Sequence, residues 1–316
     1  ETCASIAMVM FAKRMLDIEA HGQYADIMER ELYNGILSGM QLDGKAFFYV
    51  NPLEVVQGVS GKQAGYKHVL PRRPKWYTCA CCPPNIVRLM TSLGTYAWSE
   101  KEDIIYSHLY LGQAADLKKA EIHVESRYPW EGDVCYTVYP KAKKNFTLAI
   151  HIPDYIEEFT LLVNGSRADA ADKIEKGYLY LRREWMEGDT VRIQFDLKIR
   201  RVYANPEVRA DTGCAAFLRG PVVYCFETVD QEGPLHAYRI PCDAEVKAYT
   251  CSSGILNGMV LLKADGLHMK GWDSLYSETK PFAEKVRLTA VPYFAWGNRE
   301  EGDMRVWMPE MTGGGR

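Results

Sequence analysis

The sequence predicts an α+β multi-domain protein, in which a helical segment is followed by two antiparallel β-sandwich modules. Two patterns support this order. In the first hundred residues, apolar side chains recur at spacings of three and four, as on one face of an amphipathic helix. After residue 99, short apolar or alternating runs are separated by turn residues, which is typical of antiparallel sheets. The predicted boundaries are 1–98, 99–201 and 202–303, with residues 304–316 as a candidate completion of the first sandwich.

The helical segment is predicted to contain three amphipathic helices, over 5–18, 23–40 and about 86–98. The third follows Pro83-Pro84-Asn85, because proline is favoured in the first turn of a helix. Between the second and third helices, residues 46–50 are β-rich. Residues 58–75 are rich in Gly, Lys and Arg, a composition that indicates an exposed loop. The carboxylates of the second helix are expected on its exposed face: Asp26, Glu29 and Glu31.

Short strands are predicted for the first sandwich at spacings typical of this architecture. They cover 104–111, 120–125, 134–139, 146–152, 158–163, 178–181 and 190–197. The second module is predicted from β-rich stretches at 215–226, 258–263 and 286–307. A loop-like stretch over 200–212 marks the boundary between the two modules.

Composition excludes several classes of partner. The 316 residues carry 38 Lys and Arg against 41 Asp and Glu, a net charge of −3, so the chain lacks the basic footprint of proteins that bind nucleic acid or anionic membranes. No apolar run approaches the roughly 20 residues of a membrane span. The chain begins without Met on an apolar helical stretch. We therefore expect a fragment of a longer protein, with neither nucleic acid nor membrane as a partner.

Nine cysteines are present, and three of them fall within Cys79-Ala80-Cys81-Cys82. Adjacent cysteines seldom form two ordinary disulfides, so this pattern favours a thiolate metal site in a reducing compartment, the cytoplasm. Glu1 and Cys3 at the start of the first helix can complete a tetrahedral Zn²⁺ shell with Cys81 and Cys82. Cys79 is a further candidate, because a Cys-x-Cys spacing can also chelate.

Spacing alone leaves the chemistry of these cysteines open. They can form a metal site, a redox or catalytic thiol, or a group without a shared role. A closed zinc shell with four protein ligands is more often structural than catalytic. On spacing, a structural zinc that joins the first helix to the third is therefore the leading interpretation.

Residues around these cysteines resemble glycoside hydrolase family 127, the β-L-arabinofuranosidases. The shared motifs are Glu-Thr-Cys-Ala-Ser-Ile, Phe-Phe-Tyr-Val-Asn-Pro-Leu, Cys-Ala-Cys-Cys-Pro-Pro-Asn and the late Pro-Tyr-Phe-Ala-Trp-Gly-Asn-Arg. The resemblance implies that residues 1–98 are the C-terminal part of an (α/α)6 catalytic barrel, which the two sandwiches follow. It also implies Zn²⁺ as cofactor and a retaining hydrolase that releases non-reducing-end β-L-arabinofuranose from arabinofuranosides or related plant-derived oligosaccharides.

The resemblance also implies roles for single residues. Glu1, Cys3, Cys81 and Cys82 match the zinc ligands, Cys81 matches the nucleophile, and Tyr49 matches a tyrosine of the sugar subsite. The family's acid/base glutamate lies upstream of the Glu-Thr-Cys motif. We therefore expect the isolated chain to be inactive, with a missing N-terminal half or a second copy as partner. The alternative is a non-catalytic β-sandwich module with a structural zinc, acting in carbohydrate binding or as half of a split assembly.

Overall fold

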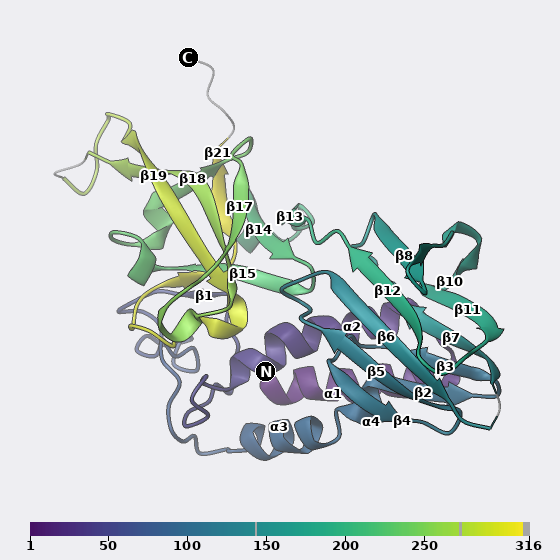
Figure 1. Cartoon of the computed structure of the whole chain (residues 1–316). Helices are drawn as coiled ribbons and strands as arrows, with labels where there is room; N and C mark the ends of the chain where they lie inside the picture. The colour runs from purple at the N-terminus through teal and green to yellow at the C-terminus, as the bar shows by residue number, and fades with distance from the viewer. Residues whose placement is uncertain (143, 272–273, 312–316) are drawn as a thin grey trace. The chain divides into compact units, whose positions relative to one another are not determined.

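The computed structural model describes residues 1–142, 144–271 and 274–311. Figure 1 shows the helices in the purple to blue part of the chain and most strands in the teal to yellow part. The chain divides into two compact units. One contains Glu1–Thr2, Tyr33–Cys82 and the described residues from Ile199 onward, and the other contains Cys3–Leu32 and Pro83–Lys198. The prediction of a multi-domain chain with helices and sheets is therefore confirmed.

The helices follow the predicted apolar periods, but their ends differ. They are α1 (Thr2–Ile18), α2 (Gly22–Arg30), α3 (Cys82–Thr91) and α4 (Gly94–Ala97). The second predicted helix is too long, because α2 gives way to a π-helical turn at Glu31–Ile36 and a 3₁₀ turn at Leu37–Gly39. Apolar residues keep their spacing through these turns, so the sequence pattern alone does not separate them from an α-helix. No helix in the described ranges is long and apolar enough to cross a membrane.

Tertiary hydrogen bonds accompany the π-helical turn. Asn34 Nδ2 donates to the carbonyl of Pro221 at 2.8 Å, and Asn34 Oδ1 accepts from the Val223 amide at 2.8 Å. The β-rich residues 46–50 contain an isolated bridge between Phe47 and Met40 instead of the predicted strand. Their amides and carbonyls bond other segments, as described below.

The unit that contains α2 also holds two sheets. The five-stranded sheet has the order β10-β11-β7-β3-β2, and the six-stranded sheet has the order β4-β5-β6-β12-β8-β9. The first consists of β2 (Trp98–Lys101), β3 (Ile104–Ser107), β7 (Asn145–His151), β10 (Ile174–Glu175) and β11 (Tyr178–Glu184). The second consists of β4 (Gln113–Asp116), β5 (Ala120–Ser126), β6 (Asp133–Pro140), β8 (Phe159–Val163), β9 (Ser166–Arg167) and β12 (Asp189–Phe195).

These two sheets share a buried core. Ser107 Oγ of one sheet and Tyr136 OH of the other lie 3.0 Å apart, and the rings of Trp98 and Tyr136 are 6.3 Å apart. Alternate residues of β6 are buried, which is the period-two pattern of a strand with one face in the core. All seven predicted runs of this module contain a strand. Pairing is antiparallel except between β3 and β7, which run parallel.

The other unit holds a ten-stranded sheet with the order β1-β20-β15-β19-β18-β16-β21-β14-β13, and β17 pairs with β18. Its strands are β1 (Glu54–Val55), β13 (Ile199–Val202), β14 (Cys214–Arg219), β15 (Val222–Glu227), β16 (Tyr238–Pro241), β17 (Val246–Thr250), β18 (Val260–Lys270), β19 (Phe282–Pro292), β20 (Met304–Arg305) and β21 (Met308–Met311). Because β14 pairs with both β15 and β21, six of these strands form a closed ring.

The last strands correct one expectation. Residues 304–316 were a candidate completion of the module over 99–201, but β20 pairs with β1 and β15, and β21 pairs with β14 and β16. Backbone hydrogen bonds therefore assign residues 304–311 to the ten-stranded sheet. Residues 312–316 lie outside the described residues.

Candidate functional site

Three thiol groups lie together at the start of two helices. The Sγ atoms of Cys3, Cys81 and Cys82 all lie within 4.8 Å of one another, and those of Cys81 and Cys82 are 3.8 Å apart. A tetrahedral zinc ion with Zn–S bonds of about 2.3 Å holds its sulfur ligands about 3.8 Å apart. Cys82 is fully buried, whereas Cys3 and Cys81 are half-buried. The spacing of these three donors fits a thiolate metal site.

Thr2 fixes the start of α1 and thereby places Cys3. Its amide donates to the carbonyl of Tyr49 at 3.1 Å, and its hydroxyl donates to the carbonyl of Phe48 at 3.0 Å. Asn51 Nδ2 donates to the same hydroxyl at 3.3 Å. The Thr2 side chain is fully buried, so these bonds satisfy polar groups that water does not reach. The end of the β-rich run and Asn51 thus fix the first residue of α1.

The adjacent cysteines belong to the start of α3. Cys82 is the first residue of this helix, and Pro83 and Pro84 occupy the first turn, where their missing N–H groups are not needed. Cys3 lies in the first turn of α1. Helix N-termini carry a partial positive charge, which favours negative groups such as thiolates. Two helix starts therefore provide an electrostatically suitable position for three thiolates.

Tyr49 borders this group. The Glu1 carboxylate, which hydrogen-bonds the phenol, raises the pKa of Tyr49, and burial, Cys81 and Cys79 act in the same direction. The ring of Tyr77 lies 6.1 Å from the ring of Tyr49 and supports it from one side. The predicted sugar-subsite tyrosine and the predicted nucleophile are therefore neighbours.

The structure brings together three of the four predicted ligands. Glu1 is exposed and is not part of the thiol group, because its carboxylate bonds the phenol of Tyr49. Cys79 is also exposed and lies outside the group. Within the described part of the chain, none of the nine cysteines forms a disulfide. A tetrahedral zinc ion held by these three sulfur atoms would take one further ligand.

Three models of one protein family match successive parts of the chain. Residues 1–95 match the model of the β-L-arabinofuranosidase GH127 catalytic domain, residues 104–197 match the GH127 middle domain, and residues 199–309 match the glycoside hydrolase family 127 C-terminal domain. The chain belongs to glycoside hydrolase family 127. The resemblance carried by its cysteine and terminal motifs is thereby confirmed.

Relatives of this family 127 chain are about twice its length. It is 39% identical to the non-reducing end β-L-arabinofuranosidase of Bifidobacterium longum subsp. longum, over 97% of the chain and 48% of that protein. A solved GH127 β-L-arabinofuranosidase from Geobacillus stearothermophilus T6 is 43% identical with a TM-score of 0.92, over 98% of the chain and 50% of that structure. A solved GH127 β-arabinofuranosidase is 34% identical with a TM-score of 0.87, over 98% and 49%. The chain spans about half the length of these relatives.

One buried arginine of this family 127 chain has no signal in the local sequence. Arg73 falls in the stretch 58–75, which was expected to be an exposed loop, yet it is only 3% exposed. Burial lowers the pKa of Arg73 to about 10, so the guanidinium remains charged at neutral pH. Its hydrogen-bond acceptors include Ser38 and Trp296, far away in the sequence. Local composition contains no signal for such acceptors.

A second buried polar cluster lies on α2, whose carboxylates were expected on an exposed face. Glu29 is 1% exposed, and Tyr155 OH donates to its Oε2 at 2.6 Å. Tyr128 bonds Tyr155, while His151 Nε2 and Asp26 Oδ1 are 3.0 Å apart. Burial raises the pKa of Glu29 to about 7. The expectation was wrong for Glu29, because α2 packs this side chain against Tyr155, which follows β7, and Tyr128, which precedes β6.

Proposed function

We propose that this chain is the C-terminal part of a retaining glycoside hydrolase that releases non-reducing-end β-L-arabinofuranose from arabinofuranosides. Family membership and the name of the Bifidobacterium relative support the substrate class. The observation that carries the proposal is the group of Cys3, Cys81 and Cys82 beside Tyr49. It combines a soft-metal donor set with a half-buried thiol next to an aromatic hydroxyl.

The thiol group is the proposed zinc site. Cys3, Cys81 and Cys82 would hold the ion, and Glu1, which already bonds Tyr49 beside Cys81, is the proposed fourth ligand. A bound zinc ion keeps its cysteine ligands deprotonated at neutral pH. The sulfur spacing and the two helix starts support this assignment. Cys79 is exposed and outside the group, so it is not included.

Cys81 is the proposed nucleophile. Its half-buried thiol is reachable, whereas Cys82 is fully buried. Attack by Cys81 Sγ on the anomeric carbon forms a C–S bond while the glycosidic C–O bond breaks, and the leaving oxygen takes a proton from a carboxylic acid. Water then hydrolyses the thioglycoside with the same carboxylate as base. Tyr49 would orient the sugar through its hydroxyl.

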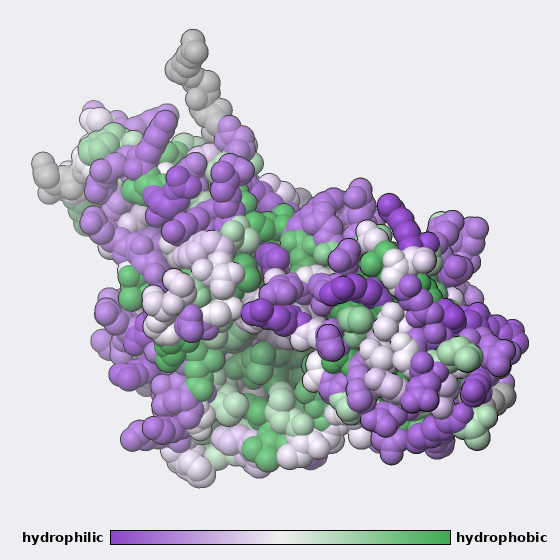
Figure 2. All heavy atoms as spheres, in the orientation of Figure 1, coloured by the Kyte–Doolittle hydropathy of each residue, from purple (hydrophilic) through white to green (hydrophobic). Residues whose placement is uncertain are grey.

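The acid/base is proposed to lie in the part of the relatives that this chain does not span. We further propose that α1 to α3 end an (α/α)6 barrel and that the sheets form two sandwiches. Exposed apolar side chains support the barrel: Met8 is 43% exposed, and Phe11 and Val87 are each 60% exposed. Figure 2 shows hydrophobic surface gathered over the region of α1 and α3. Further helices would cover such a surface, so the isolated chain is expected to be inactive.

Cys81→Ser in the full-length enzyme tests the role of the nucleophile. Turnover should fall by orders of magnitude while the fold persists, because a serine hydroxyl is a far weaker nucleophile than a thiolate. Cys79→Ser is the matched control, since it changes a thiol two residues away that lies outside the group. Zinc content and circular dichroism are measured for both variants. Unchanged turnover of the Cys81 variant would contradict the proposal.

The alternative is a structural zinc in a non-catalytic module that binds carbohydrate or forms half of a split assembly. The burial of Cys82 favours it, because structural sites are usually closed to solvent. Under this alternative, Cys81→Ser and Cys82→Ser lower stability equally, and neither has a separate effect on turnover. The same kinetic and unfolding measurements therefore distinguish the two functions.

A further inference from the structure

Arg73 is a buried cation whose donors bond main-chain carbonyls. Its Nε and Nη2 donate to the carbonyl of Ser38 at 3.1 and 2.9 Å. Its Nη1 donates to the carbonyl of Trp296 at 2.5 Å, and Nη2 donates to that of Phe294 at 3.3 Å. The guanidinium carbon lies 4.4 Å from the ring centre of Phe48. One planar group therefore contacts three separate segments of the chain.

The first of these segments leads to Cys3. Ser38 Oγ donates to Asn51 Oδ1 at 2.8 Å, and Asn51 Nδ2 bonds the hydroxyl of Thr2. Phe48, which lies under the guanidinium, accepts from the same hydroxyl through its carbonyl. Two short routes thus connect Arg73 to Thr2, the residue before Cys3.

The residues that follow Arg73 continue to the adjacent cysteines. The carbonyl of Pro74, next to Arg73, accepts from the Phe47 amide at 3.1 Å. The ring of Phe47 is 5.1 Å from that of Tyr77, which in turn packs against Tyr49. Phe47 and Tyr77 thus connect the residue after Arg73 to Tyr49, which borders Cys81.

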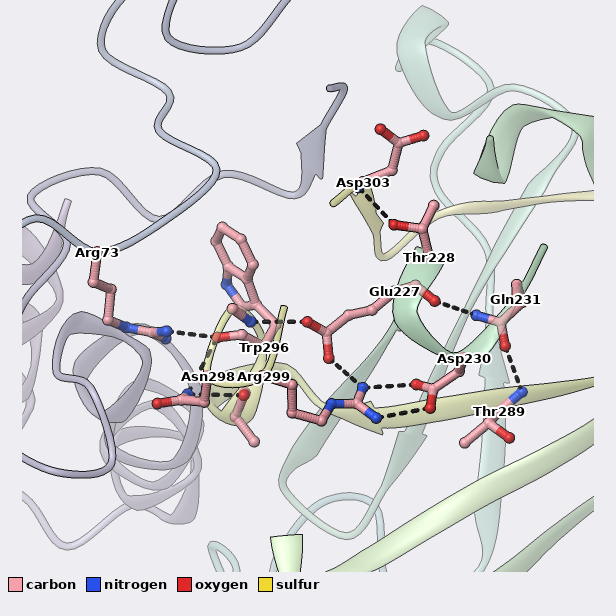
Figure 3. Close-up of polar contacts among 12 residues, drawn as sticks. Arg73, Glu227, Thr228, Asp230, Gln231, Thr289, Trp296, Asn298, Arg299 and Asp303 are labelled. Carbon is pink, nitrogen blue, oxygen red and sulfur yellow. Dashed lines mark hydrogen bonds and ion pairs between the residues drawn. The ribbon is translucent and has the colours of Figure 1, made fainter. Parts of the chain in front are cut away.

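The third segment is the late motif of the C-terminal module, which presents its carbonyls to Arg73. Glu227 Oε1 accepts from the Gly297 amide at 2.9 Å, and Glu227 Oε2 accepts from Arg299 Nη2 at 2.6 Å. Arg299 also forms a bidentate pair with Asp230 at 2.7 and 2.6 Å. Figure 3 shows this series of contacts from Arg73 through Trp296 to Glu227, Arg299 and Asp230. Charge-assisted bonds of this kind hold a loop rigidly.

We propose that Arg73 is a positioning residue for the thiol site, and that residues 292–299 are the anchor against which it holds the two cysteine-bearing segments. The buried guanidinium bonds Ser38, which Asn51 connects to Thr2, and it bonds the carbonyls of Phe294 and Trp296. Residues that orient metal ligands from outside the first coordination shell typically change metal affinity by about 10- to 100-fold. The inference rests on the proposed metal site for its main test.

Cobalt titration of the 316-residue chain provides that test, with thiolate-to-cobalt absorption as the signal. Arg73→Met should weaken Co²⁺ binding by about 10- to 100-fold, because three carbonyls lose their donors. The Co²⁺ affinity of Arg73→Lys should lie between those of Arg73→Met and the wild type. A lysine ammonium group keeps the charge but cannot reproduce the planar set of guanidinium donors. If Arg73→Met folds poorly, the Co²⁺ affinity of Arg73→Lys is compared with that of the wild type instead. Wild-type affinity in both folded variants would overturn the proposal.

Arg201→Met is the matched control. Arg201 also donates to main-chain carbonyls, those of Pro241, Cys242 and Ala244, and lies over the ring of Phe217. These partners belong to the same unit but are far in the sequence from the cysteine segment. Co²⁺ affinity should remain at the wild-type value in this variant. If the Arg73 and Arg201 variants have equal thermal stability and lose Co²⁺ affinity equally, the role of Arg73 is a general structural one.

A second readout separates this inference from the metal proposal. If the wild-type chain binds no Co²⁺, the metal site fails, and alkylation of the thiols by iodoacetamide decides the role of Arg73. Labelling of Cys3 and Cys81, followed by mass spectrometry, should become several-fold faster in Arg73→Met and stay constant in Arg201→Met. Cys251 is the internal reference, because it lies outside these contacts. Unchanged labelling of Cys3 and Cys81 in Arg73→Met would overturn the inference.

Discussion

Tyr155 donates a hydrogen bond of 2.6 Å to Glu29, a carboxyl group that is 1% exposed and whose pKa burial raises to about 7. The ordinary pKa of this group is 4.5. Between these two pH values the folded protein keeps the proton, whereas the unfolded chain has lost it. The stabilising contribution of the protonated group is complete below about pH 4.5 and is lost as the pH rises toward 7.

Glu29→Gln should remove this pH dependence, because glutamine does not ionise. We expect the free energy of unfolding of the wild type to fall, relative to the variant, by up to about 3 kcal/mol across this window. Urea unfolding at several pH values measures it. Glu19→Gln, at an exposed carboxylate on the same unit, should keep the wild-type slope. If the free energy of unfolding of Glu29→Gln changes with pH as in the wild type, another group causes the pH dependence.

Gly39→Ala should disturb Thr2, the first residue of α1. A Cβ at Gly39 would lie 2.6 Å from both Cγ2 and Oγ1 of Thr2, and Thr2 is fixed by bonds to Phe48 and Asn51. Such overpacking costs about 1–3 kcal/mol of stability. Gly94→Ala is the control, because a Cβ there meets open space. Thermal unfolding of the two variants should differ clearly, and an unchanged melting temperature for Gly39→Ala would count against a rigid Thr2.

Arg299→Met should strongly destabilise the C-terminal module. The side chain of Glu227 is 5% exposed, and the substitution would leave this carboxyl group buried without its cationic partner. Breaking a buried ion pair in this way costs about 3–5 kcal/mol. Arg192→Met removes an equally bidentate pair with Asp133 on an exposed surface, where a pair contributes about 0–1 kcal/mol. Chemical unfolding should therefore separate the two arginines, and similar losses would contradict the assigned burial effect.

Zinc should raise the melting temperature of the chain, because a ligand that binds only the folded state stabilises it by mass action. Cys3→Ser should abolish the shift, since Cys3 is one of the three grouped thiols. Cys79→Ser should retain it. A chelator added to the zinc-loaded wild type should return the melting temperature to the metal-free value. An equal zinc shift in Cys3→Ser and Cys79→Ser would place the metal elsewhere.

The spacing of apolar residues and the sequence motifs predicted much of this architecture. Strands such as β6 bury alternate residues, and this pattern is visible in the sequence. The second helix was overextended, because a π-helical turn keeps apolar spacing while Asn34 bonds Pro221 and Val223. Residues 46–50 have β-type composition, but their backbone groups bond Thr2, Gly39 and Pro74. Contacts between distant segments, which composition does not encode, decided both cases.

The thiol group was also predicted only in part from the sequence. Adjacent cysteines and the early Cys3 were predicted together from their residue types, and three of four predicted ligands meet. Glu1 instead bonds Tyr49. Sequence spacing does not show whether Glu1 contacts the thiol group or this phenol. Arg73 was missed because its acceptors at Phe294 and Trp296 lie more than half the chain away. Motifs identify the candidate ligands, whereas the residues that contact them from distant segments depend on the fold.

The closed ring of strands has a consequence for synthesis on the ribosome. β21 closes the ring between β14 and β16, so the ring is incomplete until Met308–Met311 have been translated and released. The carbonyls of Phe294 and Trp296 that hold Arg73 belong to the same late region. Arg73, although translated early, therefore gains these bonds only after Phe294 and Trp296 have been translated. Metal capture by the three thiols, as proposed above, would then follow translation of this late region.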